Sequence, residues 1–430
     1  GGAIGAGFGP DFGNTAFRGI EFRHVIRDDE MTASSASFVP AGAGIIRLIA
    51  CAAGLVVANI YYAQPLIGLI GPDIGLAPAW LGSIVMLTQL GYGCGMIGLV
   101  SLADIVENRR LVLAALGGLA LTLLAAAFAR STWAFLVMAF AIGVFATAAQ
   151  VLVPLASHLS AEKDRGRVVG TVMGGLIGGI MLARPFSSIV ADHAGWHAVF
   201  LASCAMTLVL MVALARGLPR RQPVHDGLTY GHILASLPGI LCETPLLRRR
   251  AFYQGAVFAA FNIFWTAVPV QLASAPLQLG QTGIARFALA GAGGALAAPV
   301  AGRRADRGLT NAATTGAMVM VAGGFVLGLA AVAAHALVPL AVAAIVLDAG
   351  VQTNQVISMR AIYLLRPEIR GRLNALFMTI VFLCGATGSV LAAALFHHGG
   401  WQAVSLAGAV LPLIALGRQA LAGEAMRRRA

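Results

Sequence analysis

The chain has 430 residues, of which 59% are hydrophobic and only 11% are charged, and its formal net charge is +12. An ordinary soluble domain carries about 25% charged residues, so this composition excludes a soluble globular protein and indicates a membrane protein. The alternation of polar and apolar residues that an outer-membrane barrel requires is absent, and we therefore expect membrane-spanning helices.

Twelve apolar runs of about 20 residues, the length that crosses a bilayer core of about 30 Å, follow one another along the chain. We expect residues 1–44 to be a disordered cytoplasmic tail, since the chain begins polar and glycine-rich. The first six spans form an N-terminal half over residues 45–216, at 48–70, 80–102, 111–129, 133–156, 168–191 and 196–216. The second six form a C-terminal half over residues 251–420, at 251–275, 283–303, 311–333, 336–358, 373–396 and 400–420.

Two polar segments complete the expected organisation. Residues 217–250, with their prolines and Arg248–Arg250, are expected to be a cytoplasmic linker between the halves, and residues 421–430 a basic cytoplasmic tail. The predicted fold class is an all-α integral membrane protein with twelve transmembrane helices in two six-helix, pseudo-symmetric halves.

A short pattern is repeated in the two halves. The tripeptide Arg165-Gly166-Arg167, an apolar stretch and Gly195-Trp196 return in the same order as Arg370-Gly371-Arg372 and Gly400-Trp401, 205 positions later. A repeat of this length indicates two structurally equivalent halves.

Basic residues fall mainly on one set of alternating connections. Of the 29 Lys and Arg, 23 lie on or beside these loops, whereas only Arg130 and Arg286 lie on the opposite set. By the positive-inside rule, the basic loops and both termini are cytoplasmic. The charge is thus a topology signal, the lipid bilayer is the expected surroundings, and nucleic acid is not an expected partner.

Two loop motifs and three helix segments resemble a known family. The loop after the second span reads VSLADIVENRR and contains Asp104, and the loop after the eighth reads GRRADRG and contains Asp306. Together with twelve spans in two repeats, these loops are similar to those of the major facilitator superfamily (MFS) of secondary transporters. The segments ANIYYAQPL, VLDAGVQ and RGRLNALFMT resemble those of its bacterial twelve-helix members that export drugs and other small molecules. The resemblance covers about residues 45–420 and implies the MFS fold.

The loop motifs predict a cytoplasmic gate. Asp104 ends the second span and Asp306 the eighth, while the fifth and eleventh spans begin just after the two Arg-Gly-Arg triplets. A carboxylate there can lie against a partly positive helix N-terminus and nearby arginines, and thereby close the cytoplasmic side. The alternative is a pair of solvated turn aspartates. The residues expected to form the gate are Asp104, Arg109, Arg110, Arg165, Arg167, Asp306, Arg307, Arg370 and Arg372.

Two charged residues inside the spans are candidates for proton coupling, because a charge at the centre of a membrane helix costs about 2.5–3.5 kcal/mol on insertion scales. Asp348 lies near the middle of the tenth span, on the same helix face as Gln352 and Gln355. Arg184 lies in the fifth span, about 10 Å from its outer end. We expect an ion pair between the two if spans five and ten adjoin, as the resemblance implies. The alternatives are a structural aspartate and an arginine that snorkels to the outer headgroups.

Amides and aromatic residues cluster before prolines in the first and seventh spans. Asn59 to Gln64 precede Pro65, and Asn262 to Trp265 precede Pro269. Such groups at a proline-weakened point of a helix suit a binding cavity, although helix packing is the alternative. The predicted cavity residues are Asn59, Tyr62, Gln64, Gln150, Asn262, Trp265, Gln352 and Gln355.

The sequence contains no catalytic constellation, nucleotide motif or metal-ligand spacing, so we expect neither an enzyme nor a cofactor or metal site. Transport of a small-molecule substrate is therefore expected to be driven by an ion gradient, with protons as the coupling ion and a monomer in the bacterial inner membrane as the carrier. Proton-coupled export by alternating access is favoured, since a largely apolar cavity with one acid suits lipophilic or cationic compounds. Proton-coupled uptake of a metabolite and a membrane sensor that binds without transport are the alternatives.

Overall fold

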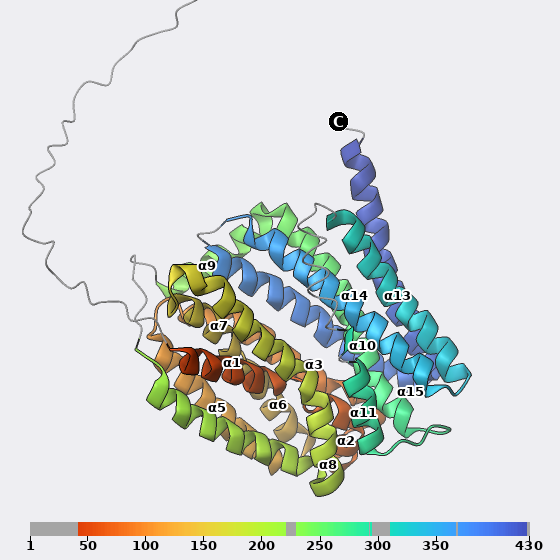
Figure 1. The fold of residues 1–430 in the computed structure, drawn as a ribbon. Coiled ribbons are helices and arrows are strands. Elements are labelled where there is room, and N and C mark those ends of the chain that lie inside the picture. The colour runs from red at the N-terminus through yellow and green to blue at the C-terminus, as the bar shows by residue number, and fades with distance from the viewer. Residues whose placement is uncertain (1–41, 221–228, 292, 295–309, 367–368, 428–430) are drawn as a thin grey trace, which may run out of the picture. The chain divides into compact units, whose positions relative to one another are not determined.

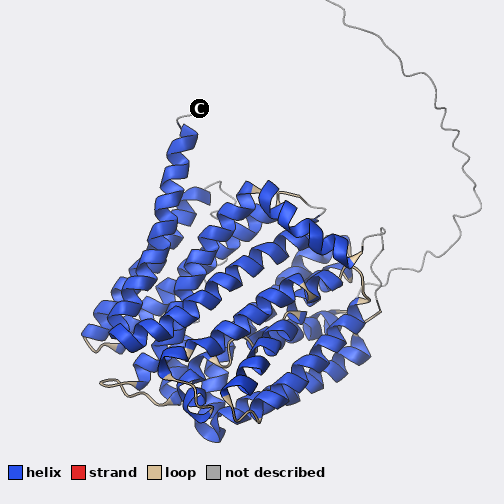
Figure 2. Ribbon diagram, turned by 180° about the vertical axis from the view of Figure 1, so that it is seen from behind, coloured by secondary structure: helices blue, strands red, loops and turns tan. Residues whose placement is uncertain are grey.

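The computed structural model describes residues 42–220, 229–291, 293–294, 310–366 and 369–427, with side chains to residue 421. All regular elements in these ranges are helices (Figure 2). Asp306 and Arg307 of the expected gate, and almost all of the expected N-terminal tail, lie outside the described residues.

The N-terminal half begins with an interrupted helix. The first span consists of α1 (Ala43–Ala58), a turn, the 3-10 helix η1 (Gln64–Leu66) and α2 (Ile67–Asp73). Pro65 lacks a backbone N–H and lies at the start of η1, where that donor is not needed. The helix is thus broken next to the predicted cluster of Asn59 to Gln64. The remaining elements of this half are η2 (Pro78–Trp80), α3 (Gly82–Ile97), α4 (Leu99–Leu102), α5 (Asn108–Ala127), α6 (Thr132–Ala146), α7 (Ala148–His158), η3 (Glu162–Asp164) and α8 (Arg165–Gly217).

The C-terminal half follows a short helix in the linker, α9 (Tyr230–Glu243). Its elements are α10 (Pro245–Ala273), α11 (Gln281–Gly291), α13 (Thr310–Ala333), α14 (Leu337–Tyr363) and α15 (Arg370–Arg427). At Pro269, unlike at Pro65, the helix is not interrupted, and α10 continues through the proline. Pro269 has no N–H and so removes the backbone hydrogen bond to the Trp265 carbonyl, but the helix does not divide there.

The repeated Gly-Trp pairs mark the same turn in both halves. Gly195 divides α8 with φ of 79°, and Gly400 divides α15 with φ of 58°, a region that favours glycine. The indole Nε1 of Trp196 then donates to Asp73 Oδ2 at 2.7 Å, and Nε1 of Trp401 donates to the carbonyl of Gly328 at 3.1 Å. With α8 and α15 divided at these glycines, the described elements correspond to the twelve spans that the sequence predicts, and α9 is the additional helix of the linker. The eighth span is described through α11 (Figure 1).

Glycines bring several helices into backbone contact. A Cβ atom on Gly54 of α1 would overlap the backbone of Gly175 and Gly179 of α8. Across the two halves, a Cβ atom on Gly82 of α3 would overlap the backbone of Ser389 of α15. Such close approach is typical of helix packing in membranes, where small residues replace the hydrophobic driving force. Helix α3 of the N-terminal half therefore packs closely against α15 of the C-terminal half.

The repeated motifs mark opposite ends of the helix bundle. The Arg-Gly-Arg end carries Arg165 and Arg370, at the starts of α8 and α15, and the Gly-Trp end carries Gly195 and Gly400.

Candidate functional site

The guanidinium of Arg184 is buried between the halves. The side chain is 5% exposed, and its Nε donates to Gln64 Oε1 at 2.9 Å. Its Cζ lies 4.3 Å from the ring centre of Trp265, 5.0 Å from that of Tyr61 and 5.2 Å from that of Phe261. These are distances at which a cation is attracted to an aromatic face. Arg184 therefore contacts the Gln64 amide of η1, the Tyr61 ring just before η1 and two aromatic rings of α10, and the side chain does not snorkel to the lipid headgroups.

Asp348 lies on α14 and is 9% exposed. Its Oδ1 accepts a hydrogen bond from Nε1 of Trp265 at 2.8 Å. Glycines let the eighth helix lie close to this pair, since a Cβ atom on Gly291 would come within 2.6 Å of the Trp265 ring and one on Gly294 within 2.5 Å of Asp348 Cβ. The carboxyl group thus lies between α10, its own helix α14 and residues 293–294.

The expected ion pair between Arg184 and Asp348 is not formed. No nitrogen of Arg184 lies within 4.0 Å of the Asp348 carboxylate. The indole of Trp265 contacts both groups, with its ring face under the guanidinium and its Nε1 on the carboxylate. The side chain of Trp265 on α10 therefore lies between the two charges and contacts both of them.

Further polar contacts join η1, α10 and α15 beside Arg184. Gln64 Nε2 donates to Thr266 Oγ1 at 3.4 Å, and Thr266 Oγ1 donates to Ser389 Oγ at 3.4 Å. The sequence prediction of cavity residues does not include Thr266 or Ser389. Thr266 follows Trp265 directly, and Ser389 occupies in the second repeat the position that Arg184 occupies in the first. These two signals were available in the sequence.

A second polar group lies where α3 meets α10 and α15. Gln89 donates through Nε2 to Asn262 Oδ1, and Asn262 Nδ2 donates to the Phe258 carbonyl at 2.9 Å. Gln150 Nε2 donates to the Tyr92 hydroxyl at 2.9 Å, and the Tyr92 ring lies 4.4 Å from that of Phe382 on α15. Asn262 and Gln150 are therefore both connected to the surface between the halves.

Other predicted cavity residues lie apart from Arg184. Asn59 accepts from Ser203 Oγ at 2.6 Å and donates to Leu55 O at 2.9 Å, so its contacts stay within the N-terminal half. The Tyr62 ring lies 5.6 Å from that of Phe186. Gln352 and Gln355 of α14 are half-buried on the side of Asp348 towards the Arg-Gly-Arg end. Of the predicted set, Gln64 and Trp265 are the residues that contact Arg184 directly.

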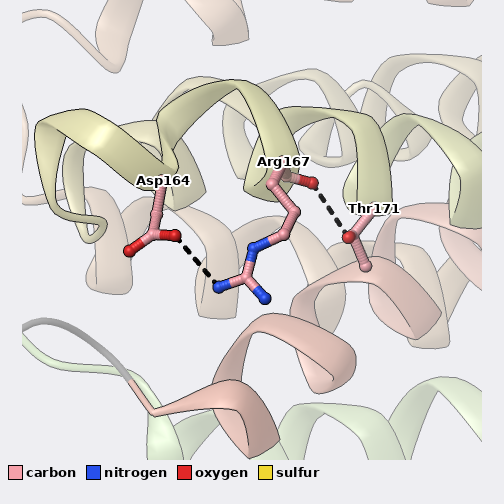
Figure 3. Close-up of polar contacts among 3 residues, drawn as sticks. All are labelled: Asp164, Arg167 and Thr171. Atoms are coloured by element: carbon pink, nitrogen blue, oxygen red, sulfur yellow. Dashed lines mark hydrogen bonds and ion pairs between the residues drawn. The ribbon is translucent and has the colours of Figure 1, made fainter.

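Four of the expected gate residues, Arg109, Arg110, Arg167 and Arg370, make contacts within their own halves. Arg167 donates to Asp164 Oδ1 at 3.1 Å, and the Thr171 hydroxyl donates to the Arg167 carbonyl at 3.0 Å (Figure 3). Arg110 contacts Glu107 at 2.9 Å, Arg109 donates to the Ala215 carbonyl, and Arg370 donates to the Tyr363 carbonyl at 2.9 Å. Asp104 and Arg165 are exposed and Arg372 is half-buried.

Comparison with known proteins decides the family. A sequence profile described as Major Facilitator Superfamily matches residues 49–270. The putative uncharacterized transporter YgaY of Escherichia coli K12 is 37% identical over 378 residues, which cover 86% of this chain and 94% of that protein. The chain belongs to the major facilitator superfamily.

Further similarities are consistent with MFS membership. The probable transporter SCO4007 of Streptomyces coelicolor is 31% identical over 394 residues, 87% of each chain. A crystal structure of a POT family transporter in complex with 5-aminolevulinic acid matches with a TM-score of 0.69 at 13% identity, over 90% of this chain and 96% of that one. That match shows the fold alone. As an MFS protein, the chain is a multi-pass membrane transporter of a small molecule and is not an enzyme.

One cavity of this MFS chain lies near the polar cluster. Its volume is about 270 Å³, and it lies between the halves at the Gly-Trp end. The lining is mostly apolar and consists of Ile67, Pro78, Leu81, Thr266, Ala267, Val270, Ala392, Ala393, Phe396 and His397. Thr266 is the residue that this cavity shares with the cluster around Arg184. The predicted coupling residues themselves do not line it.

Proposed function

We propose that this MFS member is a proton-coupled carrier that moves a small organic molecule across a bacterial inner membrane by alternating access, with Asp348 as the proton-binding group. One observation carries the proposal. Asp348 is a buried carboxyl group in the middle of a membrane helix, it accepts a hydrogen bond from a neutral indole, and Arg184 does not form an ion pair with it. A charge in such a place is costly without a function, and reversible protonation is the chemistry that a carboxyl group offers.

The orientation follows from the basic loops. If the positive-inside rule holds, both termini and the Arg-Gly-Arg end are cytoplasmic. The contacts of Thr282 Oγ1 with Asp192 Oδ2 at 2.6 Å and of Gly82 with Ser389 then join the halves on the outer side. Half-buried Gln352 and Gln355 lie between Asp348 and the cytoplasmic end. This arrangement supports access to Asp348 from the cytoplasm.

The direction of transport depends on how the substrate and the proton meet at the site. A cationic substrate competes with the proton for Asp348, and competition produces exchange and hence export. An anionic substrate is repelled by the charged carboxylate and binds together with the proton, which produces co-transport and hence uptake. The resemblance to export proteins favours the first direction.

A flux measurement on reconstituted protein tests the proposal. Proteoliposomes that contain a panel of cationic, neutral and anionic compounds receive a pH gradient of either sign, and the movement of each compound is followed. We expect a gradient of one sign to drive accumulation of at least one compound, which a proton uncoupler abolishes. Export and uptake differ in the sign that works. Binding without any flux would identify a sensor and contradict the proposal.

A further inference from the structure

Arg184 has a hydrogen-bond donor that the protein does not satisfy. Its Nη2 is buried and has no acceptor among the described residues. The amide of Gln64 accepts from Nε, and the three rings around the guanidinium offer only their faces. A buried charged donor without an acceptor costs free energy comparable to the loss of a strong hydrogen bond. Such a group is unusual in a structural role and is well suited to a ligand with an acceptor.

We propose that Arg184 anchors a binding site for a lipophilic organic anion, whose carboxylate or sulfonate accepts from Nη2 and whose apolar part lies against Tyr61, Phe261 and Trp265. The proposal rests on the proposed function in that it assigns a substrate class to the same carrier. The three ring centres lie 4.3 to 5.2 Å from Cζ, and Nη2 still lacks an acceptor among the described residues. An anion and an apolar group can therefore bind to the same side chain without competing. A charge-assisted hydrogen bond to arginine is the strongest contact that this cluster offers a ligand.

The same contacts disfavour a cation. A cationic ligand would have to bind the Asp348 carboxylate, and Trp265 already donates to one oxygen of that group. It would also lie near the positive charge of Arg184, which is separated from Asp348 by a single indole ring. Like charges at this distance repel each other strongly in a poorly hydrated site. The structure thus favours an anionic ligand, whereas the apolar cavity with one acid that the sequence predicts favours lipophilic or cationic ligands.

The anion and the proton are expected to bind together. Among the described residues, the charged or titratable groups close to Asp348 are Arg184 and Tyr61. When Asp348 is charged, it offsets the attraction of Arg184 for an anion, and a proton on Asp348 removes this effect. By linkage, the bound anion increases the affinity of Asp348 for a proton by the same factor. Substrate and proton then move in the same direction, which is the uptake alternative for this carrier.

Binding of three similar small molecules to the purified full-length protein tests the ligand charge. Benzenesulfonate, benzenesulfonamide and phenyltrimethylammonium carry a negative, a zero and a positive charge on the same ring, and calorimetry measures their affinities. We expect benzenesulfonate to bind most tightly. Arg184→Gln should weaken it by about tenfold or more, because a charge-assisted hydrogen bond is lost. Arg130→Gln, which removes an exposed arginine at the Gly-Trp end, is the matched control and should have no effect.

A variant that gains affinity for benzenesulfonate cannot be explained by misfolding. Asp348→Asn removes the negative charge, so benzenesulfonate should bind more tightly at high pH and its affinity should no longer depend on pH. Tighter binding of phenyltrimethylammonium than of benzenesulfonate, with loss of that binding in Asp348→Asn, would overturn the anion site and leave proton coupling intact. If Arg184→Gln weakens anion binding but flux through the wild-type protein does not depend on the pH gradient, proton coupling is refuted and the anion site stands.

Discussion

Gln64 is the residue through which the broken first helix controls Arg184. Gln64 begins η1, directly after the turn that breaks the first span. Its Oε1 accepts from the guanidinium Nε of Arg184 on α8, and its Nε2 donates to Thr266. A neutral amide satisfies one donor of the arginine and leaves its charge uncompensated. The positive charge is therefore kept available to a ligand or to Asp348.

Replacement of Gln64 by glutamate tests this role. Gln64→Glu places a carboxylate on the guanidinium, so we expect a bidentate ion pair that satisfies Arg184 within the protein. The melting temperature of the purified protein should be unchanged or higher, while benzenesulfonate binding should fall by about tenfold or more. Gln64→Met, which fills the same space without an acceptor, should instead lower the melting temperature. Unaltered benzenesulfonate binding in Gln64→Glu would mean that the anion does not bind Arg184.

At the scale of the helices, glycines decide which pairs can touch. Gly179 of α8 faces Gly54 of α1, where an added Cβ would overlap the Gly54 backbone, whereas a Cβ on the adjacent Gly178 would meet nothing within 4 Å. Gly179→Ala should therefore destabilise the protein by about 1–3 kcal/mol through overpacking. Gly178→Ala is the matched control and should be neutral or stabilising by roughly 0.5–1 kcal/mol, because alanine favours the helix. Thermal unfolding in detergent measures both, and equal melting temperatures would contradict the α1–α8 contact.

The loop between α4 and α5, which follows the second span, allows a second test. We expect Asp104→Asn to slow gradient-driven transport severalfold or to abolish it, since the contacts that close the cytoplasmic side would lose a charge. The amount of protein in the membrane should stay the same. Glu162→Gln, which removes an exposed acid from η3, should leave transport unchanged. Wild-type flux in Asp104→Asn would show that this aspartate is a solvated turn residue.

Sequence periodicity and duplication predict these elements well, and contacts between them poorly. The twelve apolar runs and the Gly195 and Gly400 turns follow from local composition and from the repeat. Arg184 and Asp348 are conspicuous because charges are rare inside membrane spans. The position of Trp265 between them depends instead on how α10 packs between the halves, and no local pattern encodes it. The sequence marks Thr266 by its place beside Trp265 and Ser389 by its place in the repeat, but the hydrogen bond between them also depends on how α10 packs against α15.

For the whole molecule, the two halves are joined at the Gly-Trp end by Asp192 and Thr282. If alternating access requires this end to open, a crosslink there should stop transport. In Asp192→Cys/Thr282→Cys on a background with Cys51, Cys94, Cys204, Cys242 and Cys384 replaced by serine, oxidation should reduce flux at least about tenfold and reduction should restore it. Either single cysteine variant is the control. Full flux in the crosslinked protein would contradict movement at this end.

The central claim is that Asp348 carries the proton. Proteoliposomes with wild type or Asp348→Asn allow two modes of flux to be compared: accumulation driven by a pH gradient, and one-for-one exchange of a compound that the wild-type protein accumulates. We expect Asp348→Asn to lose the gradient-driven accumulation while exchange continues, because the carrier still alternates but no longer takes up a proton. Gradient-driven accumulation at the wild-type level in Asp348→Asn would contradict this claim.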